Sequence, residues 1–187
     1  MTVREVLTMA TQFLSIEDEM KDYISSDDYT SGNKQFLTLY NALNLVYQEL
    51  ASDYYPLTKT QKIDVQNNKI FFSDLGENVL DVLSIKSSFD GLSYKFRVCE
   101  DYLYVGAKGE VEIVYSYIPT KLFANDSIEN FGGRISPRTF ALGVVYEYCF
   151  VSGLYEDAAM WHKRFCDSIK AGSTKRKNII IKERGWV

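Results

Sequence analysis

The sequence has few of the residues on which covalent cross-links and metal sites depend. Its 187 residues include three Cys, one His and three Pro. Cys99, Cys149 and Cys166 are odd in number, widely spaced and never arranged as C-x-x-C. This pattern indicates buried structural thiols in a reducing compartment rather than a disulfide framework. We therefore predict no metal site, and we expect the protein to use no cofactor.

The usual signatures of catalysis are missing as well. No G-x-S-x-G, H-E-x-x-H or Walker A pattern occurs. The single histidine, His162, falls in a predicted helix, where packing or a surface position is a commoner role than general base. The segment Gly132-Gly133-Arg134 follows no βα unit and is predicted to be a flexible loop. We expect the protein not to be an enzyme, and a hydrolase that uses scattered carboxylates is the least favoured alternative.

Long apolar runs are also missing. No window approaches 18 consecutive apolar residues, so no membrane-spanning helix is predicted. The amino terminus has the pattern of an amphipathic helix rather than a basic region followed by an apolar stretch, so no secretory signal is indicated. We expect a protein that is made in the cytosol and has no membrane partner.

Charge is divided unevenly along the chain. Residues 175–187 carry five basic residues and one acid, a net +4, whereas residues 1–170 carry 16 Lys and Arg against 24 Asp and Glu, a net −8. An acidic body lacks the basic surface that neutralises the phosphates of nucleic acid, so binding DNA or RNA is disfavoured as the primary function. The acids of residues 17–28 match no EF-hand spacing and are predicted to form a solvated surface.

Helical patterns occupy both ends of the chain. Thr2 and Glu5 form a capping box before a single apolar stripe, and Asn33 can cap a second helix with the same periodicity. Ser136 followed by Pro137 predicts a third helix start. A short acidic helix is also indicated from Glu17 to Ile24. The main predicted helices span residues 2–14, 34–52, 136–151 and 155–171.

Between the second and third of these helices, residues 54–120 alternate with a period of two. Turns are predicted at 66–68, 90–91 and 108–109, which indicates an antiparallel meander of five or six strands. The 14 Tyr and 11 Phe suit such a β-rich body and its contact surfaces. The predicted fold class is α+β: a helical bundle with an inserted antiparallel sheet or sandwich, forming one domain over residues 1–171.

Residues 172–187 are predicted to form a basic tail that leaves the domain at Gly172-Ser173-Thr174. A solubilising tail is one interpretation. The run Ile179-Ile180-Ile181 favours another, because disordered tails are usually poor in β-branched apolar residues. Such a segment can add a strand to the sheet edge of a partner. The candidate docking residues are Lys175, Arg176, Lys177, Ile179, Ile180, Ile181, Arg184 and Trp186.

The element order resembles that of the head-to-tail adaptor, or connector, proteins of tailed double-stranded DNA phages. The resemblance is carried by the segment Thr2-Val3-Arg4-Glu5-Val6-Leu7, by the helix 35–50 that leads into Asp53-Tyr54-Tyr55-Pro56-Leu57, by the strand-rich insert, and above all by the two helical segments 140–150 and 154–165. It covers nearly the whole chain.

The resemblance implies a structural virion protein of the head–tail neck, assembled in the host cytoplasm as a dodecameric ring beneath the portal. Its partners would be the portal protein, tail or neck proteins and further copies of itself. Genomic DNA would pass through the channel without specific binding. The family's carboxyl-terminal segment docks on the portal, which would correspond here to 175–187. A β-rich module that recognises carbohydrate or a host surface stays open as the alternative.

Overall fold

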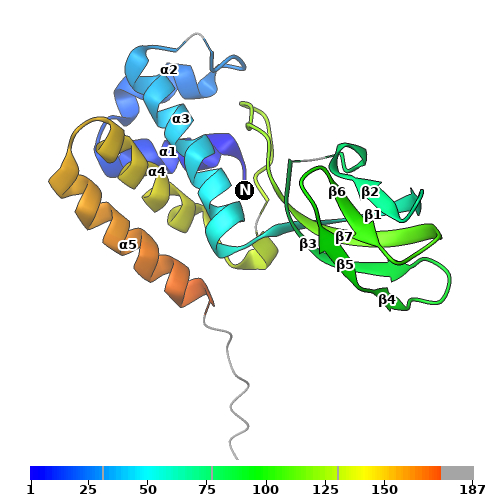
Figure 1. Ribbon diagram of the computed structural model, residues 1–187. Coiled ribbons are helices and arrows are strands. Elements are labelled where there is room, and N and C mark those ends of the chain that lie inside the picture. Colours follow the sequence, from blue (N-terminus) through cyan, green and yellow to red (C-terminus); the bar gives the residue numbers. More distant parts are fainter. Residues whose placement is uncertain (31, 77, 130, 174–187) are drawn as a thin grey trace, which may run out of the picture. The chain divides into compact units, whose positions relative to one another are not determined.

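A computed structural model describes residues 1–30, 32–76, 78–129 and 131–173 (Figure 1). The fold is α+β, as predicted, with three helices, a run of antiparallel strands and two further helices in chain order. The described chain divides into two compact units. The helical unit combines Met1–Ala42 with the chain from Ala124 onward, and the β unit comprises Leu43–Phe123. The single domain over residues 1–171 stays a prediction.

The helical unit begins with α1, Val3–Leu14, and the predicted capping box is confirmed. The Thr2 hydroxyl accepts a hydrogen bond from the Glu5 amide at 3.2 Å, and the Glu5 carboxylate accepts one from the Thr2 amide at 3.3 Å. Ser15 ends the helix in a left-handed conformation. The acidic helix is present as α2, Glu17–Ser25. Helix α1 packs against α2 and against α4.

Helix α3, Lys34–Glu49, starts where Asn33 predicts it, because the Asn33 side chain accepts a hydrogen bond from the Phe36 amide at 2.7 Å. An aromatic cluster surrounds this start: Tyr29 meets Phe36 and Tyr40 edge-on, with ring centroids 5.1 and 5.2 Å apart. Gly32 is required here, because a Cβ at that position would overlap the Phe36 ring. The α-helix ends earlier than the predicted residue 52 and continues as a π-helical turn over Leu50–Tyr54.

Helices α4, Pro137–Val151, and α5, Tyr155–Ser173, lie side by side and complete the helical unit (Figure 1). The Ser136 hydroxyl caps α4 by accepting a hydrogen bond from the Thr139 amide at 3.1 Å, as predicted. Helix α5 runs two residues past its predicted end at residue 171, through Gly172 to Ser173. Glycine fits this position because a Cβ would overlap the carbonyl oxygen of Arg134.

The strands of the β unit form two antiparallel sheets. One has the order β1-β7-β3-β4 and the other β2-β6-β5. The strands are β1 Leu57–Val65, β2 Lys69–Phe71, β3 Asn78–Ser87, β4 Ser93–Tyr94, β5 Phe96–Val98, β6 Tyr102–Val105 and β7 Gly109–Ile118. The predicted turns are confirmed by left-handed backbone at Asn67, Asn68, Gly91 and Gly109.

The predicted meander is wrong in its pairing. Strand β1 pairs with β7, about 50 residues later, rather than with its successor β2. The expected return strand 94–98 is split at Lys95, so that β4 pairs with β3 and β5 pairs with β6. The central strand β7 explains the rearrangement: β1 and β3 flank it on both edges, and its buried Val111, Ile113 and Tyr115 pack in one hydrophobic core with residues of both sheets. The β unit thus has a core shared between distant segments.

Candidate functional site

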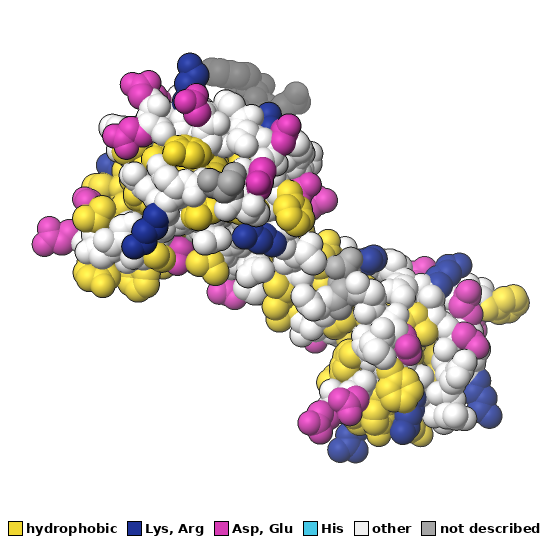
Figure 2. Space-filling model, turned by 90° about the horizontal axis from the view of Figure 1, so that it is seen from above, with side chains coloured by type: hydrophobic (Ala, Val, Ile, Leu, Met, Phe, Trp, Pro, Cys, Tyr) yellow, Lys and Arg dark blue, Asp and Glu magenta, His cyan; other side chains and the backbone are white. Residues whose placement is uncertain are grey.

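The predicted docking tail lies outside the described residues. This applies to all of its candidate residues: Lys175, Arg176, Lys177, Ile179, Ile180, Ile181, Arg184 and Trp186. Portal docking by these residues therefore stays a prediction. Candidate sites within the described residues are found among side chains that are large, apolar and exposed, because such side chains mark contact surfaces when they gather together. Hydrophobic side chains reach the surface on both units among acidic and basic ones (Figure 2).

In the β unit, the turn between β3 and β4 carries the most exposed of these side chains. Phe89 is 99% exposed and Leu92 is 64% exposed. We call residues 87–92, with these two side chains, the hairpin knob. Sequence reasoning identified Asp90-Gly91 as a turn but missed Phe89. The available signal was a large aromatic residue inside a turn, where polar residues are expected.

Hydrogen bonds hold the hairpin knob in one conformation. The backbone amide of Ser87 donates to the Leu92 carbonyl at 2.8 Å, and the Gly91 amide donates to the Ser87 carbonyl at 3.1 Å. The Ser87 hydroxyl accepts from the amides of Phe89 and Asp90, each at 3.3 Å. Hydrogen bonds from the Ser87 side chain and the Leu92 amide keep the pKa of the Asp90 carboxyl below its ordinary value. The knob therefore presents Phe89 on a pre-organised loop.

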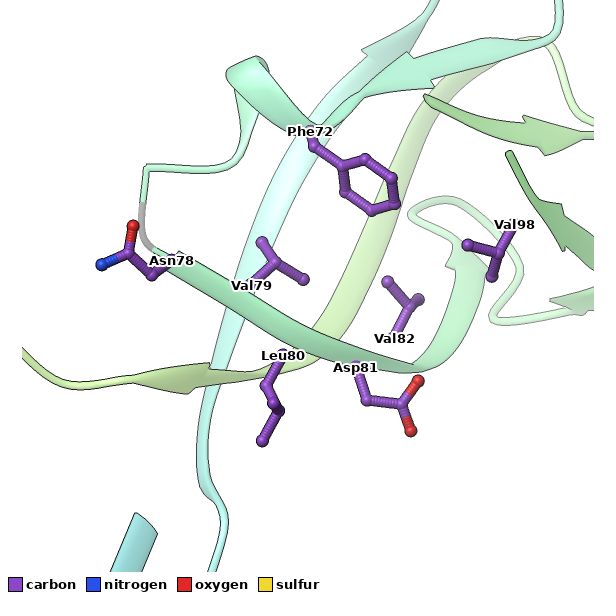
Figure 3. Close-up of a pocket in the computed structure, with 7 residues that line it drawn as sticks. All are labelled: Phe72, Asn78, Val79, Leu80, Asp81, Val82 and Val98. Atoms are coloured by element: carbon purple, nitrogen blue, oxygen red, sulfur yellow. The ribbon is translucent and has the colours of Figure 1, made fainter. Parts of the chain in front are cut away.

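The amino-terminal half of β3 borders a pocket of about 400 Å³. Figure 3 shows Val79 and Val82 on the side of β3 that faces Phe72, with Val98 of β5 beyond them. The rim is completed by Asn78, Leu80 and Asp81. We call this the β3 pocket. Val98 is 59% and Leu80 is 43% exposed, so apolar surface remains open to a ligand or partner.

The exposure of Leu80 has a cause in the backbone. The pairing of β3 with β7 shifts register between Val79 and Asp81 and again between Val82 and Ser84. These bulges leave Leu80 and Leu83 unpaired with a β7 residue, and both side chains are largely exposed. Bulges commonly redirect side chains next to binding sites. The alternation of polar and apolar residues could not have shown this, because bulges break the period of two.

In the helical unit, the connection between α4 and α5 forms a second apolar surface. Phe150, Val151, Leu154 and Tyr155 are between 49% and 66% exposed. The rings of Phe150 and Tyr155 meet edge-on with centroids 5.9 Å apart. We call these four residues the helix-turn patch. Large side chains on a short, ordered turn suit a contact with another protein.

A groove of about 490 Å³ lies between α1, α4 and α5 of the helical unit. Phe13 stacks on Trp161 with ring centroids 5.8 Å apart, and the guanidinium of Arg164 lies 4.8 Å from the Trp161 ring centroid. Arg138 and Asp167 complete its charged lining. The stack fixes α1 to α5, so these aromatic side chains have a structural role that accounts for their positions.

The side chains considered for catalysis do not form a reactive constellation. His162 Nε2 lies 3.4 Å from Cys166 Sγ one turn further along α5, and the His162 ring lies 4.7 Å from that of Tyr146. Burial raises the pKa of the Cys149 thiol, which lowers its thiolate fraction at neutral pH. Residues 132 and 133 take positive φ values in a short turn. The His162–Cys166 pair has the ordinary i, i+4 spacing of neighbours on one helix face.

The acids of residues 17–28 are exposed, as predicted. Glu17, Asp18 and Glu19 occupy the first turn of α2, where the helix dipole favours negative charge. Asp27 instead accepts hydrogen bonds from Asn125 and Arg4, which hold the pKa of its carboxyl below the ordinary value. Across the part of the chain that the structure describes, no three potential ligand residues gather into a metal site. None of the described helices combines the length and apolarity needed to cross a membrane.

No protein-family model matches this chain, and comparison with curated proteins finds no relative.

Proposed function

We propose that this protein is a structural, non-enzymatic virion component that forms a ring beneath the portal of a tailed double-stranded DNA phage. The ring joins capsid to tail and extends the DNA channel. The observation that carries this proposal is the presence of separate apolar contact surfaces, the hairpin knob and the β3 pocket on the β unit and the helix-turn patch on the helical unit. A ring requires each copy to use two different surfaces, because identical surfaces close into a dimer.

The resemblance in element order supports the same function. The helices α4 and α5 correspond to the segment that most resembles the adaptor family, and an inserted antiparallel β unit is present between α3 and α4. In this proposal the helix-turn patch contacts tail or neck proteins, and residues 175–187 dock on the portal. The acidic body, net −8 over residues 1–170, lets DNA slide through the channel without specific binding.

The test is binding to the portal protein encoded in the same phage genome. A chain truncated after Ser173 retains the whole of α5, so circular dichroism should show an unchanged fold. Co-sedimentation with portal should then be lost. Ile180→Asp should weaken docking by a few kcal/mol, because it places a charge in a desolvated strand interface. The matched change Lys175→Ala should mainly slow association and alter its salt dependence.

Two results would contradict the proposal at different points. If the truncated chain binds portal as tightly as the full chain, the tail does not dock and another surface does. If the full chain neither binds portal nor forms a ring on it by electron microscopy, the adaptor function is wrong. We expect the isolated protein to be a monomer or weak oligomer, with rings forming chiefly on the portal.

One observation favours the alternative function. Phe71, Tyr102 and Tyr104 lie on the sheet β2-β6-β5, with Phe71 and Tyr104 about half exposed. The rings of Phe71 and Tyr102 are 6.0 Å apart, and Lys69 Nζ lies 4.2 Å from the Tyr102 ring centroid. An aromatic surface of this kind suits a carbohydrate or a host protein. A glycan array with the full chain and with Tyr104→Ala would reveal it, since specific binding should disappear in the variant.

A further inference from the structure

We propose that the hairpin knob of one copy inserts into the β3 pocket of a second copy. In the resulting contact, Phe89 and Leu92 lie against Phe72, Val82 and Val98 of the neighbour. This inference deepens the proposed ring and rests on it for its biological role, while the contact itself is derived from the β unit alone. It identifies the two different surfaces by which copies join.

The exposure of Phe89 is the first observation. A side chain that is 99% exposed contributes almost nothing to the stability of its own copy. If the side chain at position 89 had no binding role, a polar residue would be expected in this exposed turn. Here several hydrogen bonds instead fix the loop that presents the ring. Pre-organisation reduces the entropy lost on binding, which is the property expected of an anchor residue.

The second observation is that the knob cannot reach the pocket of its own chain. Val82 lines the pocket, and β3 then runs away from it as far as Ser87, where the knob begins. At a rise of about 3.3 Å per residue, the two sites lie roughly 15–25 Å apart along one strand. The pairing of Ile85 with Tyr94 and of Lys86 with Ser93 holds the knob in that extended direction. Any contact between knob and pocket must therefore join two molecules.

Charge identifies a second copy as the occupant rather than an arbitrary apolar partner. The stem of the hairpin carries the exposed Lys86 and Lys95, and no ion pair joins either of them to a described residue. Asp81 lines the pocket, and the exposed Asp74 and Asp101 belong to the segments that hold Phe72: Asp74 ends the turn that Phe72 begins, and the Asp101 carbonyl accepts a hydrogen bond from the Phe72 amide at 3.1 Å. Lys86 and Lys95 of one copy therefore meet the Asp81 carboxylate at the pocket of the next, which favours correct encounter.

The size of the contact agrees with assembly on a template. An aromatic side chain buries about 150–250 Å², so a knob of one Phe and one Leu supplies less than the roughly 800 Å² per partner of a stable interface. The contact alone should be weak. Knob and pocket are different surfaces at opposite ends of β3, so in the proposed ring each copy gives its knob to one neighbour and its pocket to the other; species larger than a dimer distinguish this head-to-tail contact from a reciprocal dimer.

The experiment uses sedimentation of the full chain over a concentration series. Phe89→Asp removes the knob at a position with no packing in the monomer, and Val98→Asp places a charge in the pocket. Each should weaken self-association by about tenfold or more. Met160→Asp is the matched control, because it adds the same charge at an exposed apolar position on α5 that belongs to none of the surfaces named above. It should associate like the wild type.

A mixture of the two impaired variants distinguishes the proposed geometry from others. Phe89→Asp keeps an intact pocket and Val98→Asp keeps an intact knob, so the mixture should form heterodimers and nothing larger. The proposal is overturned if either variant associates like the wild type, if the mixture stays monomeric while each variant is folded by circular dichroism, or if the wild type itself never associates.

These outcomes are separable from those of the portal experiment. If Phe89→Asp still forms rings on the portal with unchanged affinity between neighbours, the knob contact is wrong and the adaptor function stands. If the knob variants lose self-association but the wild type does not bind portal, the contact between knob and pocket stands and the adaptor function is wrong.

Discussion

The substitution Asn44→Leu tests a single buried hydrogen bond that closes the β unit. Asn44 lies on α3, is 8% exposed, and accepts a hydrogen bond through Oδ1 from the backbone amide of Leu122 at 2.7 Å. The two residues are 78 positions apart, at the entry and exit of the β unit. Leucine has a similar volume but no acceptor, so the Leu122 amide would be left buried without this partner.

The expected cost follows from the balance of three effects. An unsatisfied buried amide costs about 1–3 kcal/mol. Leucine has a better helix propensity than asparagine, which returns only a few tenths of a kcal/mol. The variant also avoids the cost of desolvating the side-chain amide of Asn44, which offsets a further part of the loss. We expect Asn44→Leu to lower the free energy of unfolding by about 1–2 kcal/mol, with an unchanged m-value in urea.

The matched control is Gln48→Leu, one turn further along α3. Gln48 Nε2 donates to the Pro119 carbonyl at 3.5 Å, a weak bond in a part-buried position. Its loss should change stability by less than about 0.5 kcal/mol. Hydrogen exchange gives a local readout, because the Leu122 amide should lose protection in Asn44→Leu and keep it in Gln48→Leu. Equal stability losses in the two variants, or a Leu122 amide that stays protected without Asn44, would refute the reasoning.

Three further outcomes are expected. The depressed pKa of Asp27 contributes stability that is present above its unfolded-state pKa and is lost as pH falls through the lower folded value. In thermal melts between about pH 2 and 5, the melting temperature of Asp27→Asn should therefore fall less steeply with decreasing pH than that of the wild type. An identical pH dependence would remove Asp27 as a cause. Cys149 should be alkylated much more slowly than Cys99 and Cys166 in the native protein, because it is 1% exposed; mass spectrometry that finds equal rates would contradict its burial. Ser136→Ala should destabilise the protein by about 1 kcal/mol in urea through loss of the α4 cap, and a change below experimental error would show that the cap contributes nothing.

The sequence by itself determined those elements whose hydrogen bonds lie within a few residues. Thr2, Asn33 and Ser136 predicted helix starts correctly, because a capping side chain and the amide that it caps are separated by only three positions. The turns at Asp90-Gly91 and Lys108-Gly109 were likewise predictable, because positive φ at this point of a tight turn selects glycine. The α+β class followed from the order of these local signals.

Only the tertiary structure decided how the strands pair and where the contact surfaces lie. Strand β7 has β1 and β3 on its two edges and places its buried side chains in a core shared with the second sheet, and nothing in a local period of two specifies such distant partners. Within α5, Gly172 lies against the carbonyl oxygen of Arg134, where a Cβ would not fit. The β3 pocket brings Phe72 and Val98 to β3 from two other segments. These features follow from packing between residues far apart in the chain, which one-dimensional periodicity does not record.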